Sequence, residues 1–174
     1  MMEDIVRALH KVMTGQDIPI VSGSGAPILG VQGTGAFSGI FVVFGADRIR
    51  RGIPAEYYPI LALDDGNQSI WGTSAQYGVQ ITTSVLVPPK QGAIIGWEER
   101  EKYKKGILDV IDVVVGALRS NDVLTKQDGS ILTSGISGKI DVKRDSSMDS
   151  RGAFITNQVA TIMATYEAYR KEGV

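Results

Sequence analysis

The stretch YGVQITTSVLV, residues 77–87, constrains the fold more than any other part of the sequence. Its apolar, aromatic or β-branched residues recur at every second position, which is the spacing of one face of a β-strand. Two prolines follow directly, and because proline has no N–H to donate to a sheet, the strand should end at Val87. The residues on the shared face are Tyr77, Val79, Ile81, Thr83, Val85 and Val87, and Gln80, Thr82 and Ser84 lie between them on the opposite face.

The first thirteen residues, MMEDIVRALHKVM, have helical spacing instead. Ile5, Leu9 and Val12 fall on one face of a helical wheel, which predicts a short amphipathic helix. Gly15 is expected to end this helix, and Pro19 lies where a helix could not have continued.

A second and longer helix is predicted from Glu98 to Arg119. Gly106 and Gly116 fall inside it, and each weakens a helix by about 1 kcal/mol relative to alanine. We therefore expect a neighbouring element to pack closely against them. The apolar face of this helix consists of Tyr103, Ile107, Val110, Ile111, Val114 and Leu118.

Weaker signals predict the remaining strands. GIFVVF (39–44) and EYYPILAL (56–63) are rich in β-branched and aromatic residues, and a basic loop separates them. The turn residues at Asp64–Asn67 should end the second of these strands. Another strand is expected near 131–143, followed by a polar loop. The last element, from Ala153, fits either period, and its threonine, valine and isoleucine content favours a strand over a helix.

Together these elements predict a single α+β domain over residues 1–174, with an N-terminal helix and one long helix packed on one face of a mostly antiparallel sheet. The other face must be solvated or covered by another chain. Residues 22–39 contain six glycines, so the segment at about 15–39 is predicted to be a glycine-rich loop or arm.

Motifs for chemistry are incomplete. A phosphate loop needs Lys and Ser or Thr after its second glycine, but Val31 and Gln32 follow Gly25–Gly30. Ser38 replaces the third glycine of a dinucleotide-binding loop, and cysteine is absent. His10 is interpreted as a surface or rim residue. We predict no catalytic residue, cofactor or metal. The acidic residues considered and interpreted as turn or loop residues are Asp64, Asp65, Asp141, Asp145 and Asp149.

The net charge of −1 gives no overall attraction to nucleic acid or to an anionic membrane. The N-terminus lacks a signal-peptide pattern, and no apolar run approaches the ~20 residues that span a bilayer. Arg48, Arg50 and Arg51 are the one basic cluster. They are interpreted as a solvated loop, or as contacts to DNA phosphates or to acids on a neighbouring subunit.

The segment at 103–137, YKKGILDVIDVVVGALRSNDVLTKQDGSILTSGIS, resembles tail terminator and related tail-completion proteins of long-tailed bacteriophages. In that family a helix ending in an Ala-Leu-like pair leads through a polar residue into the next strand, and Ala117–Leu118, Asn121–Asp122 and Val123–Leu124 occupy those places. YYPILALDDG, VQITTSVLV and RGAFITNQVATIMATYEAY are similar to strands of the family, so the resemblance covers about four fifths of the chain. Residues 15–39 depart from the family and look like an insertion.

The resemblance implies a structural virion protein of the tail or neck, assembled in the host cytoplasm. It would form a homo-oligomeric ring, a hexamer in the family pattern, that caps the tail tube, stops its polymerisation and joins the tail to the neck or head-completion protein. DNA would pass through the lumen without specific binding. The residues assigned to a subunit or tube interface are Gly23, Gly25, Gly33, Gly35, Phe37, Arg48, Arg50 and Arg51, and those assigned to the lumen are Gln80, Thr82 and Ser84.

Other interpretations remain open. A neck protein, head-completion protein or tail tube subunit would share the same class. A small-ligand-binding protein or enzyme that uses the glycine-rich loop, and a cytoplasmic protein-binding module, belong to different classes.

Overall fold

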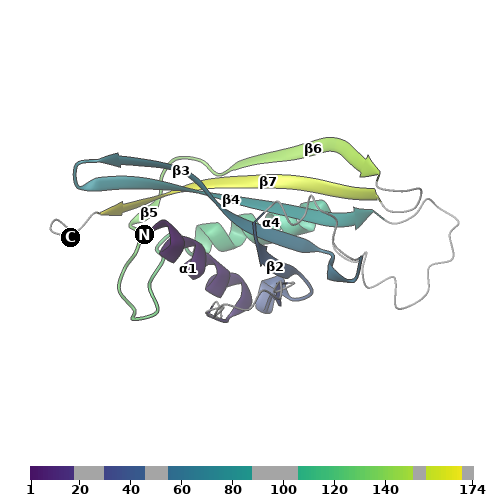
Figure 1. Ribbon diagram of the computed structural model, residues 1–174, viewed down its shortest axis with the longest axis horizontal. Coiled ribbons are helices and arrows are strands. Elements are labelled where there is room, and N and C mark those ends of the chain that lie inside the picture. Colours follow the sequence, from purple (N-terminus) through teal and green to yellow (C-terminus); the bar gives the residue numbers. More distant parts are fainter. Residues whose placement is uncertain (18–29, 46–54, 88–105, 151–155, 170–174) are drawn as a thin grey trace, which may run out of the picture.

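Seven strands form one open sheet in the computed structural model, which describes residues 1–17, 30–45, 55–87, 106–150 and 156–169 (Figure 1). The strand order is β1-β2-β3-β4-β7-β5, with β6 also paired to β7, and every pairing is antiparallel except that of β2 with β3. This confirms the predicted α+β class. The strands are β1 (Val31–Gln32), β2 (Phe41–Phe44), β3 (Ile60–Trp71), β4 (Ser74–Val87), β5 (Gly135–Ile136), β6 (Asp141–Ser150) and β7 (Thr156–Tyr169). The helices are α1 (Met2–Thr14) and α4 (Ile107–Ser120), with short 3-10 turns at Gly35–Phe37 and Ala55–Tyr57.

The strand predicted at 77–87 is confirmed as β4, which lies between β3 and β7. Ile81, for example, is opposite Leu63 on one side and Ile162 on the other. The ambiguous last element is the strand β7, which pairs with β4 from end to end. Both strands follow the two-residue period, so their register places one set of side chains toward the helices.

The turn predicted at Asp64–Asn67 is wrong. Strand β3 continues through these residues to Trp71, and the chain reverses at Gly72, whose φ of 54° suits glycine. The turn-forming residues are accommodated by a bulge between Asp65 and Gln68. A Cβ at Gly78 would lie 2.9 Å from the backbone oxygen of Asn67, so the bulge needs glycine on the facing strand.

The polar stretch after residue 143 is a strand and not the predicted loop. Strand β6 includes Asp141, Asp145 and Asp149, and a register shift separates the last two. Because β6 lies at the side of the sheet, it does not need an apolar face, which explains its polar sequence. The predicted strand near 131–143 is instead divided between β5 and the start of β6.

The first helix is confirmed as α1, and Gly15 ends it with φ 68°. The second helix begins later than predicted, because Gly106 has an extended backbone and is the N-cap residue of α4. Its N–H donates to the carboxylate of Asp109 at 2.9 Å. Gly116 would meet nothing within 4 Å if it carried a Cβ, so the expected close packing against it is wrong. The rest of the predicted helix, 98–105, lies outside the described residues.

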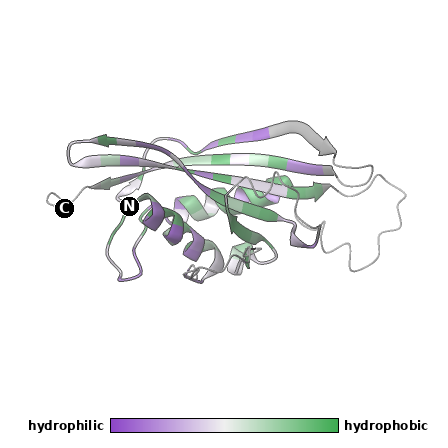
Figure 2. Cartoon of the chain, viewed as in Figure 1, coloured by the Kyte–Doolittle hydropathy of each residue, from purple (hydrophilic) through white to green (hydrophobic). Residues whose placement is uncertain are grey.

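Both helices cover the same face of the sheet, and the main core lies between them and the strands. In Figure 2 the side of α1 turned to the viewer is hydrophilic, whereas the strands carry many hydrophobic positions. No helix among the described residues is long and apolar enough to cross a membrane. The helical side chains buried in this core include Ile5, Leu9, Met13, Val110, Val114 and Leu118.

Part of the predicted glycine-rich arm belongs to the folded domain. Phe37 is only 3% exposed in the main core, and the N–H of Thr34 donates to the Met13 oxygen at the end of α1. A Cβ at Gly33 would lie 2.6 Å from the Cβ of Phe37, so glycine is required where the chain folds over this ring. Residues 18–29 of the arm lie outside the described residues.

We predict that Phe37→Ala lowers the free energy of unfolding by about 3–5 kcal/mol, because it leaves a cavity beneath α1. Urea denaturation of the purified variant measures this change. Leu108→Ala removes an apolar side chain that is 56% exposed on α4 and is the control, with an expected loss below about 1 kcal/mol. Equal losses in the two variants would contradict the burial of Phe37.

Candidate functional site

The sheet face opposite the helices carries the three residues that the sequence assigned to a lumen. Gln80, Thr82 and Ser84 alternate along β4 with the residues of the helix-side core, so they share the helix-free face. Their partners on β7 are Met163, Thr161 and Val159, and on β3 Asp64, Ala62 and Ile60. The register therefore places the three predicted residues in one row along β4, flanked on β3 and β7 by mostly small or uncharged side chains.

Exposure varies along this row. Ser84 is fully buried and Thr82 is 8% exposed, whereas Gln80 is half-buried and Met163 is 42% exposed. The buried end packs beside a second, smaller apolar cluster that includes Val43, Ile60 and Leu86. Only the part of the row from Gln80 toward the β3–β4 hairpin is therefore open to contact with another molecule.

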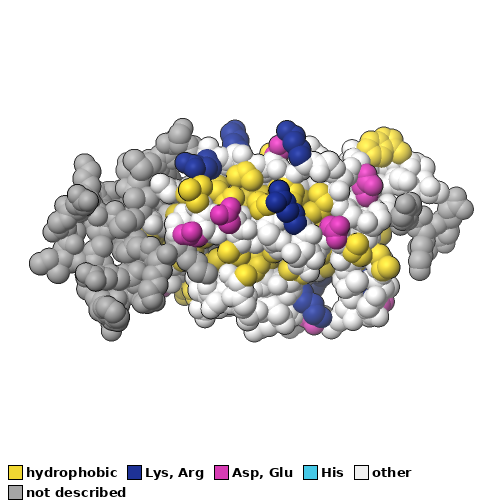
Figure 3. Space-filling model, turned by 180° about the vertical axis from the view of Figure 1, so that it is seen from behind, with side chains coloured by type: hydrophobic (Ala, Val, Ile, Leu, Met, Phe, Trp, Pro, Cys, Tyr) yellow, Lys and Arg dark blue, Asp and Glu magenta, His cyan; other side chains and the backbone are white. Residues whose placement is uncertain are grey.

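The helix-free face carries few charges on its described strand positions. Asp64, Asp141 and Glu167 are acidic and Lys143 is basic, as judged from their pairing register. Hydrogen bonds from Ser137 and Gln76 lower the pKa of Glu167, which keeps this carboxylate charged. Seen from behind, charged and apolar side chains interleave over the described surface and do not gather into a patch of one sign (Figure 3).

Polar groups are buried where this face meets the smaller cluster. The Asn157 side-chain amide donates to the Tyr58 hydroxyl at 3.1 Å. Within the described part of the chain, the Asn157 Oδ1 and Ser84 Oγ atoms are buried without a hydrogen-bond partner. Such atoms are sites for bound water in a folded protein.

The structure separates the residues predicted to form an interface. Phe37 and Gly33 belong to the core below α1, and Gly35, with φ 58°, opens the 3-10 turn that carries Phe37. The other five, Gly23, Gly25, Arg48, Arg50 and Arg51, lie outside the described residues.

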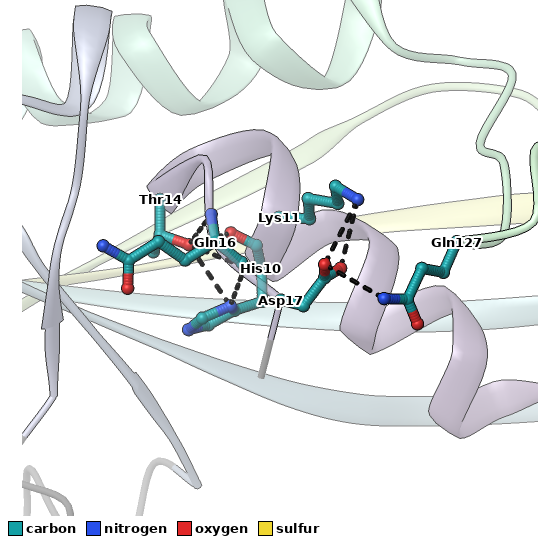
Figure 4. A network of polar contacts seen from close by, with 6 residues as sticks. All are labelled: His10, Lys11, Thr14, Gln16, Asp17 and Gln127. Atoms are coloured by element: carbon teal, nitrogen blue, oxygen red, sulfur yellow. Dashed lines mark hydrogen bonds and ion pairs between the residues drawn. The ribbon is translucent and has the colours of Figure 1, made fainter. Parts of the chain in front are cut away.

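A groove of about 620 Å³ runs between α1 and the turn at Thr125–Asp128. Asp17, one of the lining residues, forms an ion pair with Lys11 at 3.1 Å and accepts a hydrogen bond from the Gln127 amide at 3.3 Å (Figure 4). Asp17 thus joins the end of α1 to a turn more than a hundred residues later in the chain. The residues that line the groove are Asp4, Arg7, Ala8, Lys11, Asp17, Thr125, Lys126, Gln127 and Asp128.

Two charged residues of this groove, Asp4 and Arg7, are paired with groups that do not line it. Asp4 contacts the N-terminal amine at 3.2 Å, and Arg7 binds Glu3 at 2.6 Å. Hydrogen bonds from Ser130 lower the pKa of Asp128, so this carboxyl is not a proton donor near neutral pH. The groove therefore offers charged and amide groups for polar contacts.

The surface position predicted for His10 is wrong, because its side chain is only 1% exposed. The ring stacks on Phe44 with centroids 5.0 Å apart, and Nδ1 lies 3.2 Å from the Gln16 carbonyl oxygen, which accepts its hydrogen (Figure 4). Burial lowers the pKa of His10, although the bond to Gln16 and the charge of Asp17 act in the opposite direction. His10 thus holds the end of α1 as a neutral ring.

Among the described residues, no group of three or more histidine, cysteine, aspartate or glutamate side chains could hold a metal ion. No protein-family model and no curated protein matches the sequence.

Sequence reasoning missed the Asp17 contacts and the groove. The only local signal was the charge spacing of α1, where Arg7 follows Glu3 by one turn. The contact with Gln127 depends on the tertiary fold, because the two residues are 110 positions apart.

We predict that stability falls as the pH drops below about 6.5, the ordinary pKa of histidine. Above this value the ring is neutral in both states. Below it the unfolded chain binds a proton first, so the free energy of unfolding falls by up to about 1.4 kcal/mol per pH unit until the folded state also binds one. The measurement is chemical denaturation between pH 7.5 and 5.

His10→Gln is the comparison, and it is clean because the chain has 1 histidine. The variant should lose less stability than the parent over the same pH range, whatever its stability at pH 7.5. Parallel pH profiles for the two proteins would show that His10 does not titrate differently on folding.

Proposed function

We propose that this protein is a tail terminator of a long-tailed bacteriophage. In this role it forms a ring of six copies that caps the finished tail tube, stops its polymerisation and provides the surface that the neck or head-completion protein binds. It would act as a structural component of the virion, assembled in the host cytoplasm.

One observation carries the proposal: both described helices lie on the same face of a mostly antiparallel sheet, and neither of them covers the opposite face. The order of elements also agrees with the architecture that the sequence resemblance implies. An N-terminal helix precedes the long central strands, and α4 stands between β4 and the closing strand β7. In a ring, the helix layer would be outside and the sheet inside.

The chemistry of the helix-free face supports this orientation. A channel for DNA must not bind phosphates strongly, since contacts summed over a ring of subunits would hold the genome back. The open part of the face has Gln76, Gln80 and Thr165 between scattered charges that are more often acidic than basic. A lumen of this composition lets a polyanion pass.

The decisive experiment adds purified protein to polymerising tail tube protein and measures tube lengths by electron microscopy. We expect shorter tubes with a ring of extra density at one end, and hollow rings when the protein is imaged alone at high concentration. Tubes that incorporate the protein along their length would identify a tube subunit instead. Tubes of unchanged length without bound protein would overturn the proposal.

The lumen assignment makes a separate prediction. Gln80→Arg combined with Thr165→Arg should give the ring affinity for duplex DNA that falls steeply with salt, because new cations release counterions from the phosphates. Fluorescence anisotropy between about 50 and 200 mM salt measures it. Leu108→Arg with Ser120→Arg adds the same charge on exposed positions of α4 and should bind DNA less tightly. Equal affinity in both variants would count against a lumen at the helix-free face.

A further inference from the structure

The sheet has an open edge on each side. Strand β2 covers only Ile60–Leu63 of β3, and no described strand borders the outer side of β3 from Asp65 to Trp71. On the other side, β6 pairs with β7 along one edge, and no strand within the described ranges borders its second edge. An open edge presents unpaired N–H and C=O groups that can pair with another strand.

The open part of β3 has one charged side chain, Asp65, and a bulge next to it, but lacks the lysine and proline that often protect an edge. Residues 60–87 contain no lysine, arginine or proline. Ile70 is 47% exposed and Trp71 is 57% exposed, and as neighbours on one strand they face opposite sides of the sheet. The hairpin extends past the N-terminal end of α1, so the described helices do not shield its tip (Figure 1). Two exposed large apolar side chains at one edge favour burial against protein.

Both edges carry charged residues, and those of β6 are of both signs, with Lys143 and Arg144 between Asp141 and Asp145. Asp65 is exposed on β3, and Lys143 and Arg144 are exposed on β6. None of the three forms an ion pair with a described residue.

Asp65 and Arg144 also lie on the same side of the sheet. Asp65 is opposite Val79 and Arg144 is opposite Ala160, and both partners belong to the helix-side core. Side chains of directly opposed residues point to the same face, so both charges point to the helix side. A ring keeps this side outward in every copy, which allows Asp65 of one copy to meet Arg144 of the next.

We propose that β6 of one copy adds to the open edge of β3 in the neighbouring copy, so that the sheet continues from subunit to subunit. The inference rests on the proposed ring and identifies its subunit contact. Arg144 pairs with Asp65 across the junction, and Ile70 and Trp71 become buried against the neighbour. The two open segments are offset along the strand direction, since β6 borders the half of β7 that starts at Thr156 whereas the hairpin lies at its far end. Closing a sheet requires a stagger of this kind.

Charge reversal tests the contact. Asp65→Lys and Arg144→Asp should each raise the dissociation constant of self-association, measured by sedimentation velocity, by about tenfold or more. The double variant restores an opposite-charge pair and should return to within about threefold of the parent. Asp112→Lys reverses an exposed acid on α4 and is the matched control, with no expected change. Far-ultraviolet circular dichroism and thermal melting show that each variant is folded.

The apolar part of the contact has its own test. Trp71→Ser should weaken self-association while leaving the melting temperature of the dissociated chain within a few degrees, because the side chain is exposed in the free subunit. Unchanged self-association in both charge-reversed single variants, or failure of the double variant to recover, would overturn the proposed contact. If those variants still form rings and cap tubes, the proposed function stands and only the contact is rejected. If the parent protein itself fails to cap tubes, the proposed function is rejected separately.

Discussion

The structure depends on β4 being paired along both of its edges. All fourteen residues of this strand, Ser74–Val87, have partners on β7, and most have partners on β3 as well. Its side chains therefore form the middle of both faces. The odd-numbered ones support α1 and α4, and the even-numbered ones form the centre of the helix-free face. A one-residue slip in this register would exchange the two faces, so β4 fixes the helix layer and the candidate lumen together.

The strand is not uniformly apolar, although its central residues are buried. Thr83 and Ser84 are fully buried, and no described residue bonds their hydroxyl oxygens. Unsatisfied buried hydroxyls cost stability, and burial of apolar partners such as Ile60 and Ile162 offsets that cost. The buried hydroxyl of Ser84 faces the same side as Asn157, which makes this end of the sheet the most polar part of the interior.

The sequence predicted those elements whose burial repeats with a local period. Strand β4 and helix α1 each bury one regular face, and the pattern alone identified them. The same parity placed Gln80, Thr82 and Ser84 on one face, but it did not reveal that Ser84 is covered. Strand β6 escaped detection because an outer strand can be polar on both faces. The turn residues at Asp64–Asn67 misled the prediction because a bulge can accommodate them within a strand.

Tertiary contacts explain the remaining differences. His10 is polar and lies on a short helix, and its burial depends on Phe44, which arrives from β2. From the sequence, Phe37 and Gly33 belong to a glycine-rich arm. In the structure, the chain turns back under α1 at these residues. Of the predicted interface residues that are described, these two serve the core. The candidate site therefore consists of the sheet face opposite the helices and the sheet edges. There, the alternation of residues along a strand shows which positions share a face.

The positions of the charged residues on the two sheet edges bear on the kind of assembly. If β6 paired with β6 of another copy in an antiparallel dimer centred near Lys143 and Arg144, these cations would face cations of the same kind. Like charges directly opposite one another destabilise a strand pair. A contact between β6 and the acidic edge of β3 avoids this repulsion, and it uses two different surfaces of each subunit. Such a contact leaves one free β3 edge and one free β6 edge on every growing chain of subunits until rotation closes it into a ring. A ring built on this contact therefore pairs the open part of β3 and the outer edge of β6 in every subunit.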